Sequence, residues 1–421
     1  MSRCLDVQMS MVQRWAEELD SRGFGDVDGQ AVCLECVLDE ALRERLRPHL
    51  SVHRCTFCGA SGDEDGEPLA ADFEQLMYIV MEAVHFLYTT AEAGLAWDSE
   101  DGVYIGGHVL DSDDLAQDLC TDFVSDEVVV AIGEAITEQQ WAESDIASSR
   151  PDQVLRWAWE AFCRKVKHQS RFVFLSIAEE ASDHPDDMTT VQLLRTLERV
   201  IGEHGLLLDV PAGREFWRGR LADTPAKVGE YNTASALGSP PQDRASNSRM
   251  SPAGISMFYG SDDIDTVVAE IGAHSTDRYA IVGAFKTVRD LTLLNLANLP
   301  PVSSPFHDAG RASYFDLVFV HDFARDLGKP ITLDGREHIE YVPTQVVTEY
   351  LRFVMPQTVD GILFRSAQNG GVNCVLFCDA TDCADPGTPA SGPFPALREP
   401  TLELQPPSVR WVQIVSKIAV R

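Results

Sequence analysis

Four cysteines near the start of the chain have the spacing of a metal site. Cys33 and Cys36 form one CxxC pair, and Cys55 and Cys58 form a second pair after an 18-residue spacer. Two such pairs place four thiolates tetrahedrally around zinc, and a closed four-sulfur site leaves no coordination position for a substrate. We therefore predict a structural zinc site. The alternative is four buried cysteines without a metal.

The neighbouring residues and the other cysteines add two expectations. His49 and His53 lie between the two pairs and could replace one ligand. The remaining cysteines lack paired spacing, and most of them are expected to be core thiols. They are Cys4, Cys120, Cys163, Cys374, Cys378 and Cys383.

A second group of residues with chemical potential lies after residue 214. Arg218 and Arg220 flank a glycine in the sequence FWRGR. Arg249 precedes the glycine turn SPAG, which leads into a β-rich run that contains Tyr259. Glu270 follows 11 residues later, on an expected helix.

These residue types suit the cleavage of a glycosidic bond in a dinucleotide. Arginine forks match the oxygens of a pyrophosphate bidentately, and Tyr259 can stack on a planar ring. A buried carboxylate near two arginines can hold a ribose hydroxyl and stabilise positive charge that develops at a sugar carbon. Taken alone the pattern has low specificity, because such arginines are more often surface charges and Glu270 a solvated helix residue.

Helical periodicity dominates the middle of the chain. Apolar residues recur at steps of three and four from Phe73 to Leu87, from Asp152 to Phe174 and from Thr189 to Ile201. This spacing predicts amphipathic helices. In the second run Ser149 is placed to cap the helix and Pro151 sits near its first turn.

After about residue 206 short β-rich runs appear, separated by Gly, Pro and Asn. They begin at residues 257, 279, 316, 360 and 372, and the closing VRWVQIVSKIAV predicts a strand that returns to a sheet. Helices are expected over Ile264–Ile271 and Thr344–Val354, the latter capped by Thr344. Residues 233–248 are expected to form a mobile loop.

We therefore divide the chain into four segments. Residues 1–68 form the zinc-binding segment, 69–205 a helical domain, 206–383 a mixed-sheet domain, and 384–421 a Pro-rich linker with a terminal strand. The fold class is α+β.

The charge is concentrated in one part of the chain. With 34 basic and 66 acidic residues among 421, the formal net charge is 34 − 66 = −32. The 95 residues from Cys55 to Ser149 contain 22 acidic side chains and no Lys or Arg. Such a surface repels phosphate backbones and anionic lipids, so nucleic-acid and membrane-surface binding are not expected. No apolar run approaches the roughly 18 residues of a membrane helix, and we expect a cytoplasmic protein.

The motifs after residue 214 resemble those of the RES domain, named for its Arg, Glu and Ser. The stretch FWRGR…LGSPP…SRMSPAGISMFYG…VVAE…YVPTQ…DGILFRSA…GGVNCVLF carries the resemblance over about residues 206–380. The preceding segments resemble the HEPN/RES amino-terminal domain. One position departs from the common pattern, since Met250 stands where Trp is frequent, and this change touches no polar role.

The resemblance implies an ADP-ribosyltransferase-like fold and a toxin that consumes NAD by phosphorolysis or hydrolysis of the nicotinamide–ribose bond, or that modifies a protein. It implies that the arginines Arg218, Arg220 and Arg249 hold the substrate, together with the strand tyrosine Tyr259. Glu270 would be the glutamate that stabilises the oxocarbenium-like transition state. Ser366 would be the serine that orients a phosphate or another acceptor.

Two other functions compete with this one. The helix that contains WEAFCRKVKHQSRF carries Arg164 and His168, and HEPN ribonucleases use such a pair, but with four to six residues between them rather than three. A salt-bridged helix face is the simpler interpretation. The third hypothesis is a non-catalytic regulator in which the RES domain is a sensor. Expected partners are NAD, an antitoxin or restraint by the amino-terminal half, and a second copy of the chain.

Overall fold

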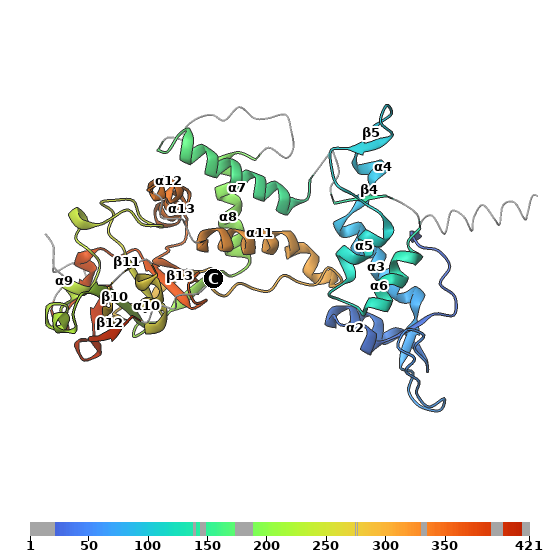
Figure 1. Ribbon diagram of the computed structural model, residues 1–421, viewed down its shortest axis with the longest axis horizontal. Coiled ribbons are helices and arrows are strands. Elements are labelled where there is room, and N and C mark those ends of the chain that lie inside the picture. Colours follow the sequence, from blue (N-terminus) through green and yellow to red (C-terminus); the bar gives the residue numbers. More distant parts are fainter. Residues whose placement is uncertain are drawn as a thin grey trace, which may run out of the picture. The chain divides into compact units, whose positions relative to one another are not determined.

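The computed structural model describes residues 22–137, 140–143, 149–172, 188–273, 275, 277–329, 335–388 and 399–414. These residues form two compact units (Figure 1). The first unit contains the chain up to Val154 and the later segment Val302–Leu317, and the second contains the other described residues. The predicted helical segment 69–205 is thus shared between the units.

The first unit opens with a small antiparallel sheet in the order β1-β3-β2. Its strands are β1 (Ala31–Cys33), β3 (Ala70–Asp72) and β2 (Leu50–Val52). Helix α2 (Glu40–Leu46) lies between β1 and β2 in the chain and begins at the capping residue Asp39, whose carboxylate accepts a hydrogen bond from Leu42 N. The two CxxC pairs lie on the segments that enter and leave this sheet.

Four helices follow in the first unit, and they build its core. They are α3 (Phe73–Leu87), α4 (Ala91–Gly94), α5 (Ser112–Cys120) and α6 (Asp126–Ala135). Helix α3 buries the residues whose spacing predicts it, including Phe73, Leu76 and Val80. Short strands complete the unit: β4 (Thr89–Thr90), β7 (Val109–Leu110) and β8 (Trp141–Ala142) in one sheet, and the hairpin of β5 (Ala96–Asp98) and β6 (Val103–Ile105).

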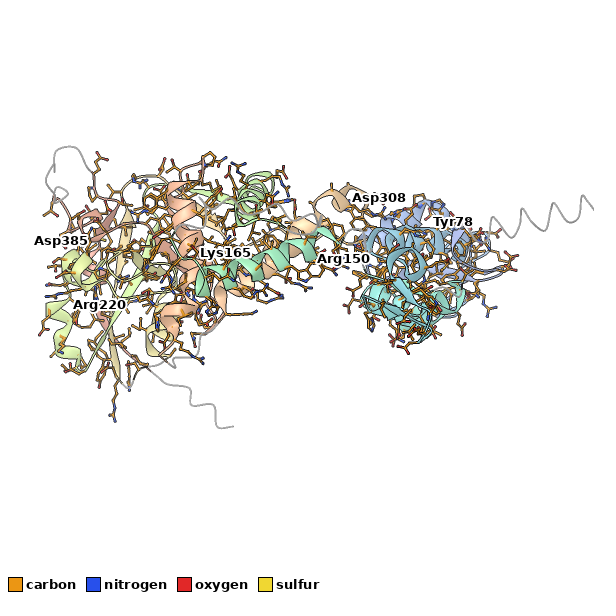
Figure 2. All side chains as sticks on the ribbon, turned by 90° about the horizontal axis from the view of Figure 1, so that it is seen from above. Tyr78, Arg150, Lys165, Arg220, Asp308 and Asp385 are labelled. Carbon is orange, nitrogen blue, oxygen red and sulfur yellow. The ribbon has the colours of Figure 1, made fainter. Side chains whose placement is uncertain are left out.

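The segment Val302–Leu317 belongs to the first unit through its own side chains. Phe306 is fully buried in the core that α3, α5 and α6 share. Arg45 on α2 donates to Asp308, which is labelled in Figure 2, with an N–O distance of 3.1 Å. The same guanidinium donates to Glu82 on α3 over 2.6 Å.

A ten-stranded mixed sheet forms the body of the second unit. Most of its strand pairs are antiparallel, and β13–β14 and β16–β17 are parallel. The order is β16-β17-β12-β10-β11-β15-β14-β13-β9, and β18 also pairs with β12. The strands are β9 (Leu207–Val210), β10 (Glu215–Ala222), β11 (Phe258–Ser261), β12 (Tyr279–Thr287), β13 (Leu291–Asn295), β14 (Gly361–Arg365), β15 (Val372–Leu376), β16 (Cys383–Ala384), β17 (Leu402–Leu404) and β18 (Arg410–Gln413). The expected α+β fold with a mixed sheet is confirmed.

Seven helices of the described chain contribute to the second unit (Figure 1). Helix α8 (Thr190–Glu203) begins with a capping box between Thr189 and Gln192. Unit boundaries fall inside α7 (Pro151–His168) and α11 (Arg311–Gly328). The others are α9 (Ala234–Leu237), α10 (Ile264–Gly272), α12 (Glu337–Glu340) and α13 (Val342–Phe353). None of the described helices is both long and apolar enough to cross a bilayer.

The strand predicted at residue 316 is wrong, because DLVFVHDF lies inside α11. The buried residues Leu317, Val320 and Phe323 recur every third position and continue to Leu327 at the next helical step. Three of them face the same core, so the helical period decides the structure although the run is short and apolar. The runs at 257, 279, 360 and 372 are strands as predicted.

Two predicted loop segments are more ordered than expected. Residues 233–248 contain α9, whose Leu237 is fully buried. In the segment 384–421, strands β17 and β18 pair with β12 of the large sheet, and so the closing strand is confirmed for Arg410–Gln413. Cys4 and residues 415–421 lie outside the described part of the chain.

Candidate active site

A cavity of about 360 Å³ lies in the second unit, where α10 crosses strands β10, β11 and β15. The ends of α11 and β14 and the start of α13 close its other sides. Its polar lining consists of Arg218, Arg249, Tyr259, Ser261, Glu270, Tyr341, Gln368 and Asn373. Four predicted site residues, Arg218, Arg249, Tyr259 and Glu270, therefore share one cavity although they come from separate parts of the sequence.

Helix α10 places Glu270 by packing tightly on β10. The helix begins after Asp263, whose carboxylate accepts a hydrogen bond from Thr266 N over 2.8 Å. A Cβ atom at Gly219 would lie 2.7 Å from Val267 Cγ1, so only a glycine at this position of β10 admits the helix so closely. Val267 and Glu270 then lie on the same face of α10 and both line the cavity.

Two neutral side chains hold the Glu270 carboxylate. Ser366 Oγ donates to Glu270 Oε1 over 2.6 Å, and Asn373 Nδ2 donates to the same oxygen over 2.7 Å. Asn373 is itself fixed, because its Oδ1 accepts a hydrogen bond from Ser261 Oγ over 2.7 Å. In the part of the chain that the structure describes, both hydrogen bonds of the carboxylate go to Oε1. Oε2 therefore remains available to a ligand in the cavity.

The hairpin of β14 and β15 brings both donors to the glutamate. Ser366 follows the last residue of β14, and its N–H donates to the Gly371 carbonyl over 2.8 Å to close the hairpin turn. Asn373 is the second residue of β15 and lies opposite Ser261 in the antiparallel pairing with β11. Both side chains that donate to Glu270 Oε1 therefore come from this one hairpin.

Arg218 is a buried cation of the cavity wall. It is 9% exposed and donates from Nε to the Leu237 carbonyl over 2.9 Å and from Nη1 to the Tyr259 carbonyl over 2.5 Å. Burial lowers the pKa of its guanidinium to about 10, and the neighbouring charge of Arg220 adds to the decrease. The group stays protonated near neutral pH. Besides these carbonyls, the guanidinium contacts the Phe258 ring, 5.2 Å from its centroid, and an anion in the cavity would compensate its charge.

Arg249 is held by backbone carbonyls at the end of α11. Its Nη1 donates to the Leu327 carbonyl over 2.7 Å, and its Nη2 donates to the Lys329 carbonyl over 2.5 Å. Burial lowers the pKa of this guanidinium as well, and the nearby Tyr341 and Glu270 offset part of the decrease.

The motif YVPTQ fixes the turn that carries Arg249. The Thr344 hydroxyl donates to the Arg249 carbonyl and, over 2.9 Å, to the Tyr341 carbonyl. Gln345 Nε2 donates to the Ser248 carbonyl over 2.8 Å. Helix α13 begins at Val342 with Tyr341 as its N-cap, so Thr344 lies inside the first turn and does not cap the helix. Its hydroxyl holds the neighbouring loop instead.

Tyr259 joins the same turn to the sheet. Its hydroxyl accepts a hydrogen bond from Met250 N over 3.3 Å and shares one with Ser251 Oγ over 2.9 Å. Burial raises the pKa of the phenol, so it stays neutral. The ring is left as a wall of the cavity, against which a planar group can pack.

Two predicted site residues lie apart from this cavity wall. Ser366 contacts Glu270 but lines a neighbouring cavity. Arg220, labelled in Figure 2, lies on β10 and donates from Nη2 to the Gly238 carbonyl over 3.1 Å, and it does not line the cavity. Its nearness to Arg218 in sequence does not place it beside the same ligand.

Asn373 is the cavity residue that sequence reasoning missed most clearly. It interrupts the apolar strand VNCVLF, and a buried polar residue in such a strand requires partners. That interruption is the signal that could have identified it. Cys374 next to it also lines the cavity, and its complete burial raises the pKa of the thiol, which makes it a poor nucleophile.

The four predicted zinc ligands meet in the first unit. The sulfur atoms of Cys33, Cys36, Cys55 and Cys58 all lie within 4.8 Å of one another. Neighbouring sulfurs are 3.6 Å apart for Cys33 and Cys58 and 3.8 Å apart for Cys36 and Cys55. A tetrahedral ion with zinc–sulfur bonds of about 2.3 Å separates its sulfurs by about 3.8 Å. The cluster therefore fits a metal ion, and neither His49 nor His53 belongs to it.

The basic stretch of α7 makes at least one ion pair. Lys167 Nζ donates to Glu340 Oε2 over 2.6 Å. Lys165, labelled in Figure 2, lies on the same helix. This pair agrees with a salt-bridged helix face, the simpler of the two predictions for this stretch, but its acidic partner is Glu340 and not the expected acidic stretch of residues 55–149.

Two family models match the chain. The model described as the RES domain matches residues 217–396, and the HEPN/RES N-terminal domain 1 matches residues 49–180. No curated protein and no solved structure matches it. The RES match includes every polar residue that lines the cavity, and at the family level it supports a toxin-like, NAD-related enzymatic function. The chain is therefore a RES-domain protein with a HEPN/RES amino-terminal domain.

Proposed function

We propose that the cavity binds NAD and that the enzyme breaks the bond between nicotinamide and ribose. The observation that carries the proposal is the Glu270 carboxylate, held through Oε1 by Ser366 and Asn373 and left with Oε2 for a ligand. A carboxylate fixed in this way beside an aromatic wall can stabilise a developing cation. An ADP-ribosyltransferase-like fold of the domain is part of the same proposal.

The cations of the cavity suit the anionic part of the dinucleotide. Two of the five N–H groups of Arg218 donate to carbonyls, as do two of those of Arg249, so each guanidinium keeps donors for phosphate or ribose oxygens. Tyr259 provides the surface for the nicotinamide or the ribose. We assign Arg220 no direct contact, because its side chain lies outside the cavity wall.

In the reaction the C1′–N bond breaks, and its electron pair neutralises the pyridinium of nicotinamide. The ribose then carries oxocarbenium-like charge, which Glu270 stabilises through a ribose hydroxyl and by its own charge. An acceptor oxygen forms the new bond to C1′ and loses its proton. Water gives ADP-ribose, inorganic phosphate gives ADP-ribose 1″-phosphate, and a protein side chain gives an ADP-ribosylated protein.

Product analysis tests the proposal and identifies the acceptor. The purified protein is incubated with NAD with and without inorganic phosphate, and the products are identified by mass spectrometry. We expect release of free nicotinamide in stoichiometric amount with the ribosyl product. Intact NAD under both conditions would contradict the proposal, and RNA cleavage that is lost in His168→Ala would favour the ribonuclease hypothesis instead.

Asn373 is proposed as a positioning residue for Glu270. Asn373→Leu is expected to lower kcat about tenfold with little change in KM, because the carboxylate loses one of its two donors. Asn373→Asp is expected to move the acid limb of the pH–rate profile to higher pH, since two adjacent carboxylates resist simultaneous ionisation. A loss of activity without any change in the profile of the Asp variant would assign Asn373 a structural role alone.

We propose zinc as the ion of the four-cysteine cluster. Its four sulfur ligands leave no open position, so the ion would organise the first unit and take no part in the reaction.

A further inference from the structure

A second cavity of about 430 Å³ adjoins the proposed active site. Gly328 and Ala367 line both cavities, and they are among the smallest side chains in the protein. Ser366, which holds Glu270, lines the second cavity. The boundary between the two spaces is therefore made of residues that obstruct little.

Arg249, which lines the first cavity, holds one part of this boundary in place. Arg249 donates to the carbonyls of Leu327 and Lys329, which flank Gly328 at the end of α11. A Cβ atom at Gly328 would meet only the Arg365 carbonyl, at 3.6 Å, an ordinary contact. Packing therefore does not require a glycine here, and no side chain at this position stands between the two cavities.

The second cavity is lined by both cationic and apolar side chains. Arg325, Lys329 and Arg365 line it together with His321, and no acidic side chain does among the described residues. Leu296 and Leu299 contribute apolar surface. This combination is unusual in a chain with a net charge of −32.

Unlike Arg325 and Lys329, the exposed Arg365 has no acidic partner among the described residues. Its three hydrogen bonds go to the carbonyls of Ala297 and Gly370 and to the side chain of Asn298, and in the described residues it forms no ion pair. Arg325 and Lys329 each pair with an aspartate one turn away on α11. A phosphate group would compensate Arg365 with charge-assisted hydrogen bonds.

We propose that the two cavities form one bipartite site, in which the second cavity binds the nucleoside phosphate that lies beyond the scissile half of the substrate. This inference rests on the proposed function. The apolar side chains contact the planar base, Arg365 contacts a phosphate oxygen, and the chain of the ligand passes between Gly328 and Ala367. The enzyme then prefers a dinucleotide to a mononucleotide that carries the same scissile bond.

Kinetics with two substrates test the inference. NAD and nicotinamide mononucleotide contain the same bond to nicotinamide, but only NAD has the distal nucleotide. In Arg365→Gln we expect KM for NAD to rise about tenfold with kcat nearly unchanged, and kcat/KM for the mononucleotide to stay within twofold. Inhibition by adenosine monophosphate should weaken in parallel.

Further variants separate the possible outcomes. Arg325→Gln, on an exposed face of α11, should also raise KM for NAD, by a smaller factor, and it provides a second test if Arg365→Gln folds poorly. Arg278 is exposed and lines neither cavity, so Arg278→Gln should leave KM and kcat for NAD unchanged. Values of KM for NAD within twofold of wild type in both cavity variants would overturn the inference. A rise in KM for inorganic phosphate instead would make the cavity an acceptor site and overturn it too. Failure of the wild-type protein to consume NAD would reject the proposed function itself.

Discussion

Glu270→Gln is expected to reduce the rate of NAD cleavage by a factor of about a hundred to a thousand, the range for removal of one electrostatic contribution to a transition state. The amide loses the negative charge that stabilises the ribosyl cation. Its Oε1 can still accept from Ser366 and Asn373, because both hydrogen bonds of the wild-type carboxylate go to that single oxygen. The fold of the domain is therefore expected to persist, and the decrease should be in kcat.

The measurement is release of nicotinamide under saturating NAD, together with a thermal melt of each variant. Asp265→Asn is the matched control, since Asp265 lies on the same helix, is exposed and does not line the cavity. Wild-type turnover by the Gln variant would reject the assigned role of Glu270. A large fall in melting temperature would leave Asn373→Asp, with its pH profile, as the deciding variant.

Loss of the metal is expected to have the second large effect, this time on stability. Structural zinc contributes roughly 10–16 kcal/mol of binding free energy in zinc-finger peptides, and much of that is folding free energy. Cys33 ends β1 and Cys36 follows it, whereas Cys55 and Cys58 follow β2, so without an ion the three-stranded sheet loses a link between its segments. We expect about one zinc per chain in the purified protein and a clear loss of stability with a chelator or with Cys36→Ser.

Zinc content by elemental analysis and the thermal melt of the first unit are the measurements. Cys163→Ser serves as the control, because Cys163 is on α7 and outside the cluster. The zinc content of this variant should equal that of the wild-type protein. A cooperatively folded protein that contains no zinc, or one whose melting is unchanged by Cys36→Ser, would contradict the proposal. Loss of the ion should lower the rate of NAD cleavage only to the extent that it lowers the fraction of folded protein.

Local patterns predicted a large part of the fold. The spacing of Phe73, Leu76 and Val80 gave α3, and the short β-rich runs separated by Gly, Pro and Asn gave five of the ten strands of the mixed sheet. Such patterns are reliable because they report the period of one element on one buried face. They fail at DLVFVHDF, where a short apolar run is consistent with either period and its neighbours along α11 decide.

Longer-range relations could not be predicted from those patterns. The segment Val302–Leu317, which contains Phe306, belongs to the first unit, although the strands that precede it in the chain belong to the second. No local period encodes this, because the core that receives Phe306 is built mainly from residues 24–141, at least 165 positions earlier in the chain.

The sequence by itself determined the chemical groups of this protein: four cysteines in paired spacing, the arginines and tyrosine of the RES motifs, and Glu270 on a helix. Only the tertiary structure decided which of them act together. Asn373 reaches Glu270 from 103 residues away and Ser366 from 96, and Arg220 is excluded although it is two residues from Arg218. The physical reason is strand register. The pairing of Ser261 with Asn373, and the glycine of β10 that admits α10, set which side chains point at one oxygen, and neither is visible in the spacing of residues along the chain.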